Sequence, residues 1–238
     1  MPEPRHRGTH RVRTRVIALP LLAAGIVSAW WIGTPAPDEQ ASSAHVQVAS
    51  DGTKQAPAPE RTYRASTCDL APQRGATPAP LSWEIPAIGQ RAGFQPSGKN
   101  GASIELPDAP AGTIYADDAP LGAEHGAVLQ AGHVDYAPGV LSEAGGELSP
   151  WGYLHQIPEC SHVYQADEAG TVHEYVVTDV YTVAQDDLPA QDELFRLDGD
   201  PALYMITCSG PSVEDAGGAF AFNYSHNLIV KAVPAQTA

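Results

Sequence analysis

The sequence predicts one all-β domain, a sandwich or a barrel, over residues 81–238. Short apolar runs rich in Val, Thr and Tyr alternate there with Gly, Pro, Asn and Asp, a pattern typical of strands joined by tight turns. Helical periodicity is weak, so we expect only short helical turns, within residues 142–154 and 191–197. The expected strands are residues 82–88, 103–106, 127–131, 162–165, 172–183, 203–208 and 221–233.

The first 33 residues differ in composition from the rest of the chain. Residues 1–15 form a basic head with five Arg, and residues 16–33 carry no charge. As a helix, the second segment spans about 27 Å, close to the hydrocarbon thickness of a bilayer. Because Arg precedes this segment and does not follow it, the positive-inside rule predicts a cytoplasmic N-terminus. We expect a single transmembrane helix, with a secretory signal as the alternative; either way, the following residues are exported.

Residues 34–80 are rich in Ala and Pro and poor in branched aliphatic side chains. Such a segment buries too little apolar surface to offset the entropy lost on ordering, and its Pro residues extend it. We therefore expect an extracellular tether between the membrane and the domain at residues 81–238.

The charge of the chain excludes one class of partner. There are 28 acidic and 13 basic residues, which gives a net charge of −15, and only four of the basic residues follow residue 80. A protein that binds nucleic acid needs a basic surface to displace counterions from phosphates. We therefore expect no nucleic-acid partner.

An exported domain with three cysteines leaves at least one of them unpaired. Three pairings are possible. Cys208 follows the apolar run 202–207 and precedes a turn, so its side chain is expected at the mouth of a sheet. We expect Cys68, in the tether, to pair with Cys160, in a polar loop, which leaves Cys208 free. The alternative for Cys208 is an inert buried thiol.

A thiol nucleophile requires a base, or a cation that lowers its pKa. Of the nine histidines, His133 has the most suggestive position, because it follows the apolar run 126–132 and so also lies where a strand ends. Cys208 and His133 are therefore the candidate nucleophile and base. The acid pairs at 117–118 and 186–187 lack the spacing of a calcium loop, so we expect neither a metal nor another cofactor.

Four segments together resemble the sortases, and specifically the actinobacterial class F type. They read WEIPAIG at residues 83–89, IELPD at 104–108, AVLQAGHVD at 127–135 and LYMITCSGP at 203–211. The resemblance covers residues 82–233 and implies a closed eight-stranded β-barrel with Cys208 and His133 at one groove. A membrane anchor and a tether fit a type II membrane sortase.

One position departs from the family pattern. Sortases carry a catalytic Arg on the strand after the Cys, whereas this chain has Ser225 there and no Arg after residue 208. Losing an oxyanion donor typically costs about 10²–10³ in rate. The candidate substitutes as hydrogen-bond donors are Ser225, His226 and Arg196, and the motifs add Thr207, Asp135 and Asn227 as supporting residues.

By resemblance, we expect a single-pass protein of the cell membrane with an extracellular cysteine transpeptidase domain. It would cleave a C-terminal sorting signal of the Leu-Pro-x-Thr-Gly kind through a thioacyl intermediate on Cys208, with His133 as acid and base. The acyl group would pass to an amine of a cell-wall precursor or a pilin. One alternative is a catalytically impaired sortase-fold module that binds peptides or cell-wall material. Another is a surface domain in which Cys208 and His133 lie too far apart to interact.

Overall fold

The computed structural model describes residues 46–48, 50, 53–65, 67–97, 99–100, 103–136, 140–142, 145–214 and 222–236. These residues belong to one compact unit, Ala41–Ala238. The predicted basic head and transmembrane anchor, residues 1–33, lie outside the described residues. Within the described part of the chain, no helix is both long and apolar enough to cross a membrane.

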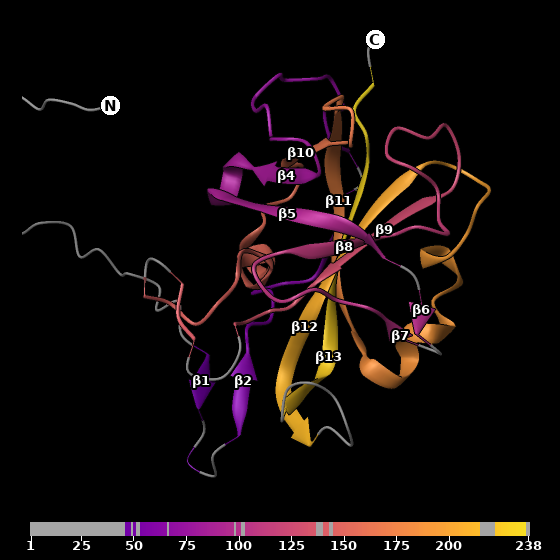
Figure 1. Cartoon of the computed structure of the whole chain (residues 1–238). Helices are drawn as coiled ribbons and strands as arrows, with labels where there is room; N and C mark the ends of the chain where they lie inside the picture. Colours follow the sequence, from indigo (N-terminus) through magenta and orange to yellow (C-terminus); the bar gives the residue numbers. More distant parts are fainter. Residues whose placement is uncertain are drawn as a thin grey trace, which may run out of the picture. The chain divides into compact units, whose positions relative to one another are not determined.

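Eight strands form a closed barrel (Figure 1). Around the barrel, each strand pairs with the next in the order β12-β13-β11-β10-β4-β5-β8-β9, and β9 pairs with β12 to close the ring. The β5–β8 and β9–β12 pairs are parallel and the others antiparallel. The strands are β4 (Ser82–Ile85), β5 (Gln90–Ser97), β8 (Gly112–Tyr115), β9 (Ala127–Gly132), β10 (His162–Ala166), β11 (Val172–Ala184), β12 (Ala202–Glu214) and β13 (Phe222–Pro234). The predicted all-β barrel is confirmed.

The sequence analysis missed two barrel strands, β5 and β8, and assigned residues 103–106 to a strand of the domain. In the structure, β7 (Ser103–Ile104) pairs only with β6 (Lys99–Asn100), in a separate two-stranded ribbon. β5 contains Gly and Pro and has four exposed residues among eight, so its sequence resembles a loop. Pro96 is tolerated near the end of β5, because the N–H group that proline lacks is needed less at the end of a hydrogen-bonded strand pair.

Three short strands come from the segment that the sequence analysis describes as a tether. They are β1 (Gln47–Val48), β2 (Lys54–Ala56) and β3 (Tyr63–Arg64). β2 pairs with β12 and β3 with β11, so this part of the chain lies along the barrel. The difference from the sequence expectation has a physical reason: the barrel supplies backbone partners and apolar surface that the segment lacks by itself.

The barrel interior is closed at one end by the short 3₁₀ helix η2 (Pro150–Gln156). Trp151 and Leu154 of η2 are fully buried, and the Trp151 ring meets Trp83 edge to face with 5.3 Å between centroids. A Cβ atom at Gly132 would lie 2.3 Å from the Trp151 ring, so glycine is required there for the helix to enter. The other short 3₁₀ helices are η1 (Pro86–Ile88), η3 (Gln185–Ala190) and η4 (Asp192–Leu194).

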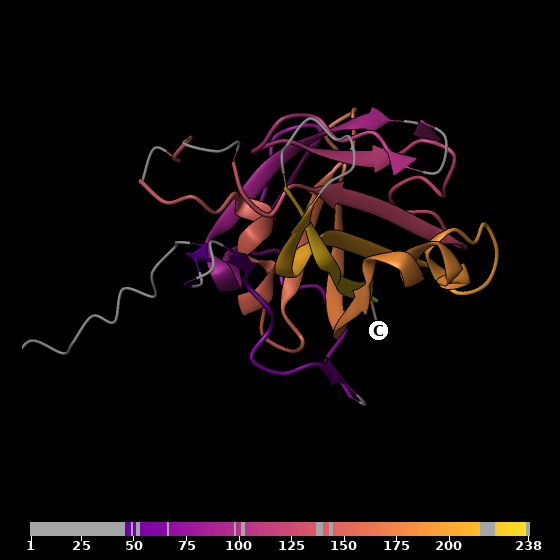
Figure 2. The same ribbon diagram turned by 90° about the horizontal axis from the view of Figure 1, so that it is seen from below.

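A second apolar cluster joins the outer face of β9, β12 and β13 to η3 and η4. The ribbon of these short helices lies beside the barrel in Figure 2. Leu194 of η4 packs on Tyr204 of β12, and Leu188 of η3 packs against the same cluster. Glu193 fastens this segment, because it accepts hydrogen bonds from the hydroxyls of Tyr181 (2.8 Å) and Tyr204 (3.1 Å). The outer face of β12 is therefore covered by side chains up to the position of the cysteine.

Candidate active site

Cys208 lies on β12, and His133 directly follows β9, the parallel neighbour of that strand. In the parallel pair of β9 and β12, Tyr204 is opposite Leu129 and Ile206 is opposite Ala131. The pairing ends there; continued by two residues, this register would set Cys208 opposite His133, which follows the end of β9. Because side chains alternate along a strand, Cys208 faces the outer side of β12, as Ile206 does.

Asn227 continues this row on the other side of Cys208. The antiparallel pairing of β12 and β13 sets Asn227 directly opposite Cys208, and the pairing of β13 with β11 sets Asn227 opposite Val183. The row across the outer face is therefore His133, Cys208, Asn227 and Val183. The adjacent Thr207 has the opposite parity and faces the barrel interior, where its buried Oγ1 has no hydrogen-bond partner among the described residues.

The β1–β2 hairpin and two barrel segments cover the thiol. Cys208 packs against a small apolar cluster, made of Val46, Ala56, Val134, Leu148 and Tyr224 together with Tyr153. The first two of these precede the barrel in sequence. β2 pairs with β12 just beyond the cysteine, where Gly210 is opposite Ala56, and the Ser209 hydroxyl donates to the Pro57 carbonyl at 2.9 Å. An N-terminal segment thus forms one wall of the site.

Burial keeps the cysteine and the histidine uncharged in this closed arrangement. Burial is the main reason why the pKa of Cys208 is raised to about 12, and the nearby Asp135 carboxylate adds to the shift. Burial also lowers the pKa of His133, although Asp135 and Asp108 oppose this. At neutral pH the pair is therefore a thiol and a neutral imidazole, which is a resting state and not the reactive ion pair.

The backbone around His133 is fixed by two hydroxyl groups that the sequence analysis did not identify. Ser149 donates to the His133 carbonyl, and its oxygen also accepts from the Trp151 N–H at the start of η2. Tyr224 donates to the Asp135 carboxylate at 2.7 Å. Ser149 before Pro150 is a recognisable helix N-cap signal, but its partner 16 residues earlier depends on the fold.

Ser225 and His226, two of the candidate donors, contact each other. The Ser225 Oγ and His226 Nδ1 atoms are 2.8 Å apart. The register of β12 and β13 shifts between Ser209 and Ser212, at Gly210, whose φ is +79°. A Cβ atom at Gly210 would lie 2.8 Å from Ser225 Oγ and 2.9 Å from His226 Nδ1. The bulge therefore brings two neighbouring side chains to one place, and only glycine leaves room for them.

Arg196, the third candidate, lies at the opposite end of the strands. Its carbonyl accepts from the N–H of Ala127, the first residue of β9, and its guanidinium donates to the carbonyls of Asp198 and Asp200. Ala127 is opposite Ala202, six residues before Cys208, which corresponds to about 20 Å along β12. Arg196 therefore cannot take the place of the missing active-site Arg.

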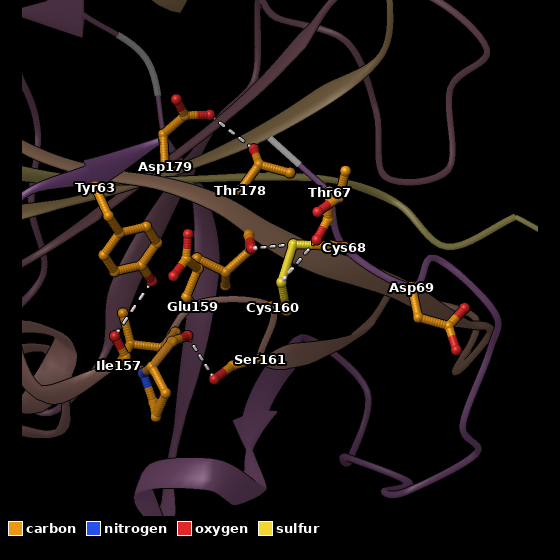
Figure 3. The surroundings of a disulfide bond; sticks show 12 residues. Tyr63, Thr67, Cys68, Asp69, Ile157, Glu159, Cys160, Ser161, Thr178 and Asp179 are labelled. Atoms are coloured by element: carbon orange, nitrogen blue, oxygen red, sulfur yellow. Dashed lines mark hydrogen bonds between the residues drawn. A yellow bond between two sulfur atoms is a disulfide. The ribbon is translucent and has the colours of Figure 1, made fainter. Parts of the chain in front are cut away.

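A disulfide joins Cys68 to Cys160, whose Cα atoms are 5.4 Å apart (Figure 3). It connects the N-terminal segment to the loop before β10 and leaves Cys208 as the one free cysteine of the three. The Cys160 N–H also donates to the Val177 carbonyl of β11 at 3.0 Å. The disulfide therefore fixes the chain to the barrel at residue 68, independently of the pairing of residues 46–57 with β12.

Within the described ranges, no group of three or more His, Cys, Asp or Glu residues is arranged to hold a metal ion.

Comparison with known families identifies the barrel. The model of the sortase domain matches residues 83–235, about two thirds of the chain. The chain belongs to the sortase family. The matched range begins at the second residue of β4, so the β1–β2 hairpin of this sortase precedes the family domain.

Solved sortase structures share a distant likeness with this one. Sortase C from Clostridium perfringens is 14% identical, with 66% of this chain and 69% of that chain covered and a TM-score of 0.43. Sortase E1 from Streptomyces coelicolor, solved with a tripeptide in its active site, is 14% identical, with 65% and 86% covered and a TM-score of 0.43. Such values carry no argument about residues or substrates. No curated protein matches the chain.

Proposed function

We propose that this sortase-family protein is a membrane-anchored cysteine transpeptidase of the class F type. Its substrate would be the C-terminal sorting signal of a surface protein, of the Leu-Pro-x-Thr-Gly kind. The observation that supports this most directly is the parallel pairing of β9 and β12, whose register leads toward Cys208 on one strand and His133 just past the end of the other. A nucleophile and a proton carrier on two rigid strand ends are the minimum that thiol acyl transfer needs.

In the first half-reaction, His133 takes the proton of the Cys208 thiol. The sulfur attacks the Thr carbonyl carbon, and an S–C bond forms while the carbonyl electrons move to oxygen. The carbonyl then re-forms, the C–N bond breaks, and His133 gives a proton to the leaving amine. In the second half-reaction, an incoming amine attacks the thioacyl carbon while His133 accepts its proton, and the thiolate leaves. The amine would belong to a cell-wall precursor or a pilin.

The anchor at residues 16–33 would hold this sortase in the cell membrane, with the N-terminus in the cytoplasm and the barrel outside. Its support is the sequence: the uncharged run and the preceding Arg residues. The Cys68–Cys160 disulfide is consistent with an exported domain, because disulfides persist in oxidising surroundings.

The decisive experiment incubates the full-length protein, in detergent, with fluorogenic sorting-signal peptides and an amine acceptor. We expect cleavage, a thioacyl adduct detectable by mass spectrometry, and a peptide–amine product, all of which are absent from Cys208→Ala. Absence of an adduct with every peptide, together with an unreactive thiol, would rule out the enzyme.

A specific observation favours one other function, a catalytically impaired module that binds peptides. The position of the family Arg holds Ser225, which is hydrogen-bonded to His226, and Arg196 is remote. Peptide binding without cleavage, unaffected by Cys208→Ala, would support this second function.

A further inference from the structure

The side chain of Asn227 is buried beside the nucleophile without a partner for its donor group. Only 9% of the residue is exposed, and its Nδ2 atom has no hydrogen-bond partner among the described residues. Leaving a buried donor unsatisfied costs folding free energy, and such groups need an explanation when they occur. An amide donor that waits for a ligand is one such explanation.

The position of Asn227 indicates which ligand atom it would meet. Asn227 is the direct cross-strand partner of Cys208, and directly opposed side chains have Cβ atoms about 4.5–5.5 Å apart. On the other side of Cys208, the row continues to His133. A carbonyl group attacked by the Cys208 sulfur would therefore lie between an imidazole on one flank and the Asn227 amide on the other.

Three other donors of β13 are engaged or remote. Ser225 and His226 bond each other at 2.8 Å. Lys231, four residues beyond Asn227 on β13, lies 3.6 Å from the Glu193 carboxylate and stacks over the Tyr204 ring. Four strand residues correspond to about 13 Å, so this ammonium group is out of reach of the thiol.

We propose that the Asn227 side-chain amide donates the hydrogen bond that stabilises the oxyanion during acyl transfer to Cys208. This inference rests on the proposed function and assigns to Asn227 the role left vacant by the family Arg. As the S–C bond forms, negative charge develops on the carbonyl oxygen and the Nδ2–H group neutralises part of it. When the carbonyl re-forms, the negative charge on its oxygen disappears, and the oxygen no longer requires the hydrogen bond from Asn227.

The closed structure is compatible with this role. The amide nitrogen is buried, and the partly buried thiol packs against a cluster that includes Val46 and Ala56. Cys208 and His133 are both partly exposed, whereas the Asn227 amide is buried beside them. The donor is then desolvated in advance, and fixed donors in a dry site act most strongly on a developing charge.

The test compares two reactions of the same thiol in full-length protein. Acylation by p-nitrophenyl acetate passes through an oxyanion, whereas alkylation by iodoacetamide does not. For Asn227→Ala we expect the acylation rate to fall about 10²–10³-fold, as for loss of one oxyanion donor, while alkylation stays at the wild-type rate. Val183→Ala, the next residue in the row, removes bulk without removing a donor, and should leave both rates unchanged.

The ratio of the two rates decides the question. If acylation and alkylation fall together in Asn227→Ala, or if neither falls, Asn227 has no oxyanion role, although wild-type acylation would still support the transpeptidase. If the wild-type thiol reacts with neither reagent, the proposed function and this inference both fail. Asn227→Gln, which keeps an amide donor, provides a second variant should the alanine variant unfold, and should retain more acylation than Asn227→Leu.

Discussion

The two halves of β12 differ in how they are held. Residues 202–206 lie between β9 and β13, with Leu203 and Met205 buried in the barrel. From Cys208 onward, β2 replaces β9 as the neighbour, with two paired residues, and the register with β13 shifts at Gly210. The nucleophile therefore lies where a rigid strand meets a locally adjustable one. The barrel part of β12 fixes the position of the thiol, whereas β2, which is paired over only two residues, can detach from β12.

The largest expected effect concerns the base at the end of β9. His133→Ala should lower the rate of peptide cleavage about 10²–10⁴-fold, because the leaving amine then lacks its proton donor. The exposed His125 lies just before β9 and provides the matched control. Steady-state cleavage of a sorting-signal peptide measures the effect, and equal rates for His133→Ala and His125→Ala would contradict the role of His133.

The rigid half should carry most of the stability of the strand. Leu203 is fully buried, so Leu203→Ala should lower the free energy of unfolding by about 2–5 kcal/mol through lost burial and a cavity. Val213, in the other half, is 40% exposed, and Val213→Ala should cost much less. Urea denaturation monitored by tryptophan fluorescence compares the two; equal losses would mean that the halves are equally rigid.

Displacement of β2 should activate the thiol. Ala56 is fully buried against β12, so Ala56→Glu should detach the strand, because a buried unpaired charge is costly. The pKa of Cys208 would then fall from about 12 toward the ordinary value near 8.5. At pH 8 we expect alkylation to rise about 100-fold, since the gain in thiolate is partly offset by its lower nucleophilicity.

The pH profile of alkylation provides the check on this prediction. In the wild type, the rate should climb until about pH 12, whereas in Ala56→Glu it should level off above about pH 9. The control is Val48→Glu, on the partner strand β1, where the side chain is 63% exposed. If both variants keep the wild-type profile, residues other than the hairpin determine the burial of Cys208.

The smallest expected effect is at the far end of β12. Arg196 is committed to the carbonyls of its own loop, so Arg196→Ala should leave kcat and KM for peptide cleavage unchanged. Its loss should change stability by only about 0.5 kcal/mol, as is usual at a surface. A fall in kcat with unchanged thermal stability would restore Arg196 as an active-site donor.

The parts of the molecule that the sequence predicted are those encoded locally. β9, β11 and β12 follow from continuous apolar or β-branched runs, and the end of such a run points to Cys208 and His133. Other parts could not be found in this way. β5 reads as a loop because Gly93 and Pro96 interrupt it, and its strand character comes from pairing with β4 and β8.

By itself, the sequence determined the all-β class, the excess of acidic residues, the two candidate catalytic side chains and the absence of an Arg after residue 208. Only the tertiary structure decided which side chains surround the thiol. The placement of Asn227 opposite Cys208, the contact of Ser225 with His226 and the hairpin over the site all depend on strand register. Register is a property of paired strands far apart in the chain, so a linear pattern does not contain it.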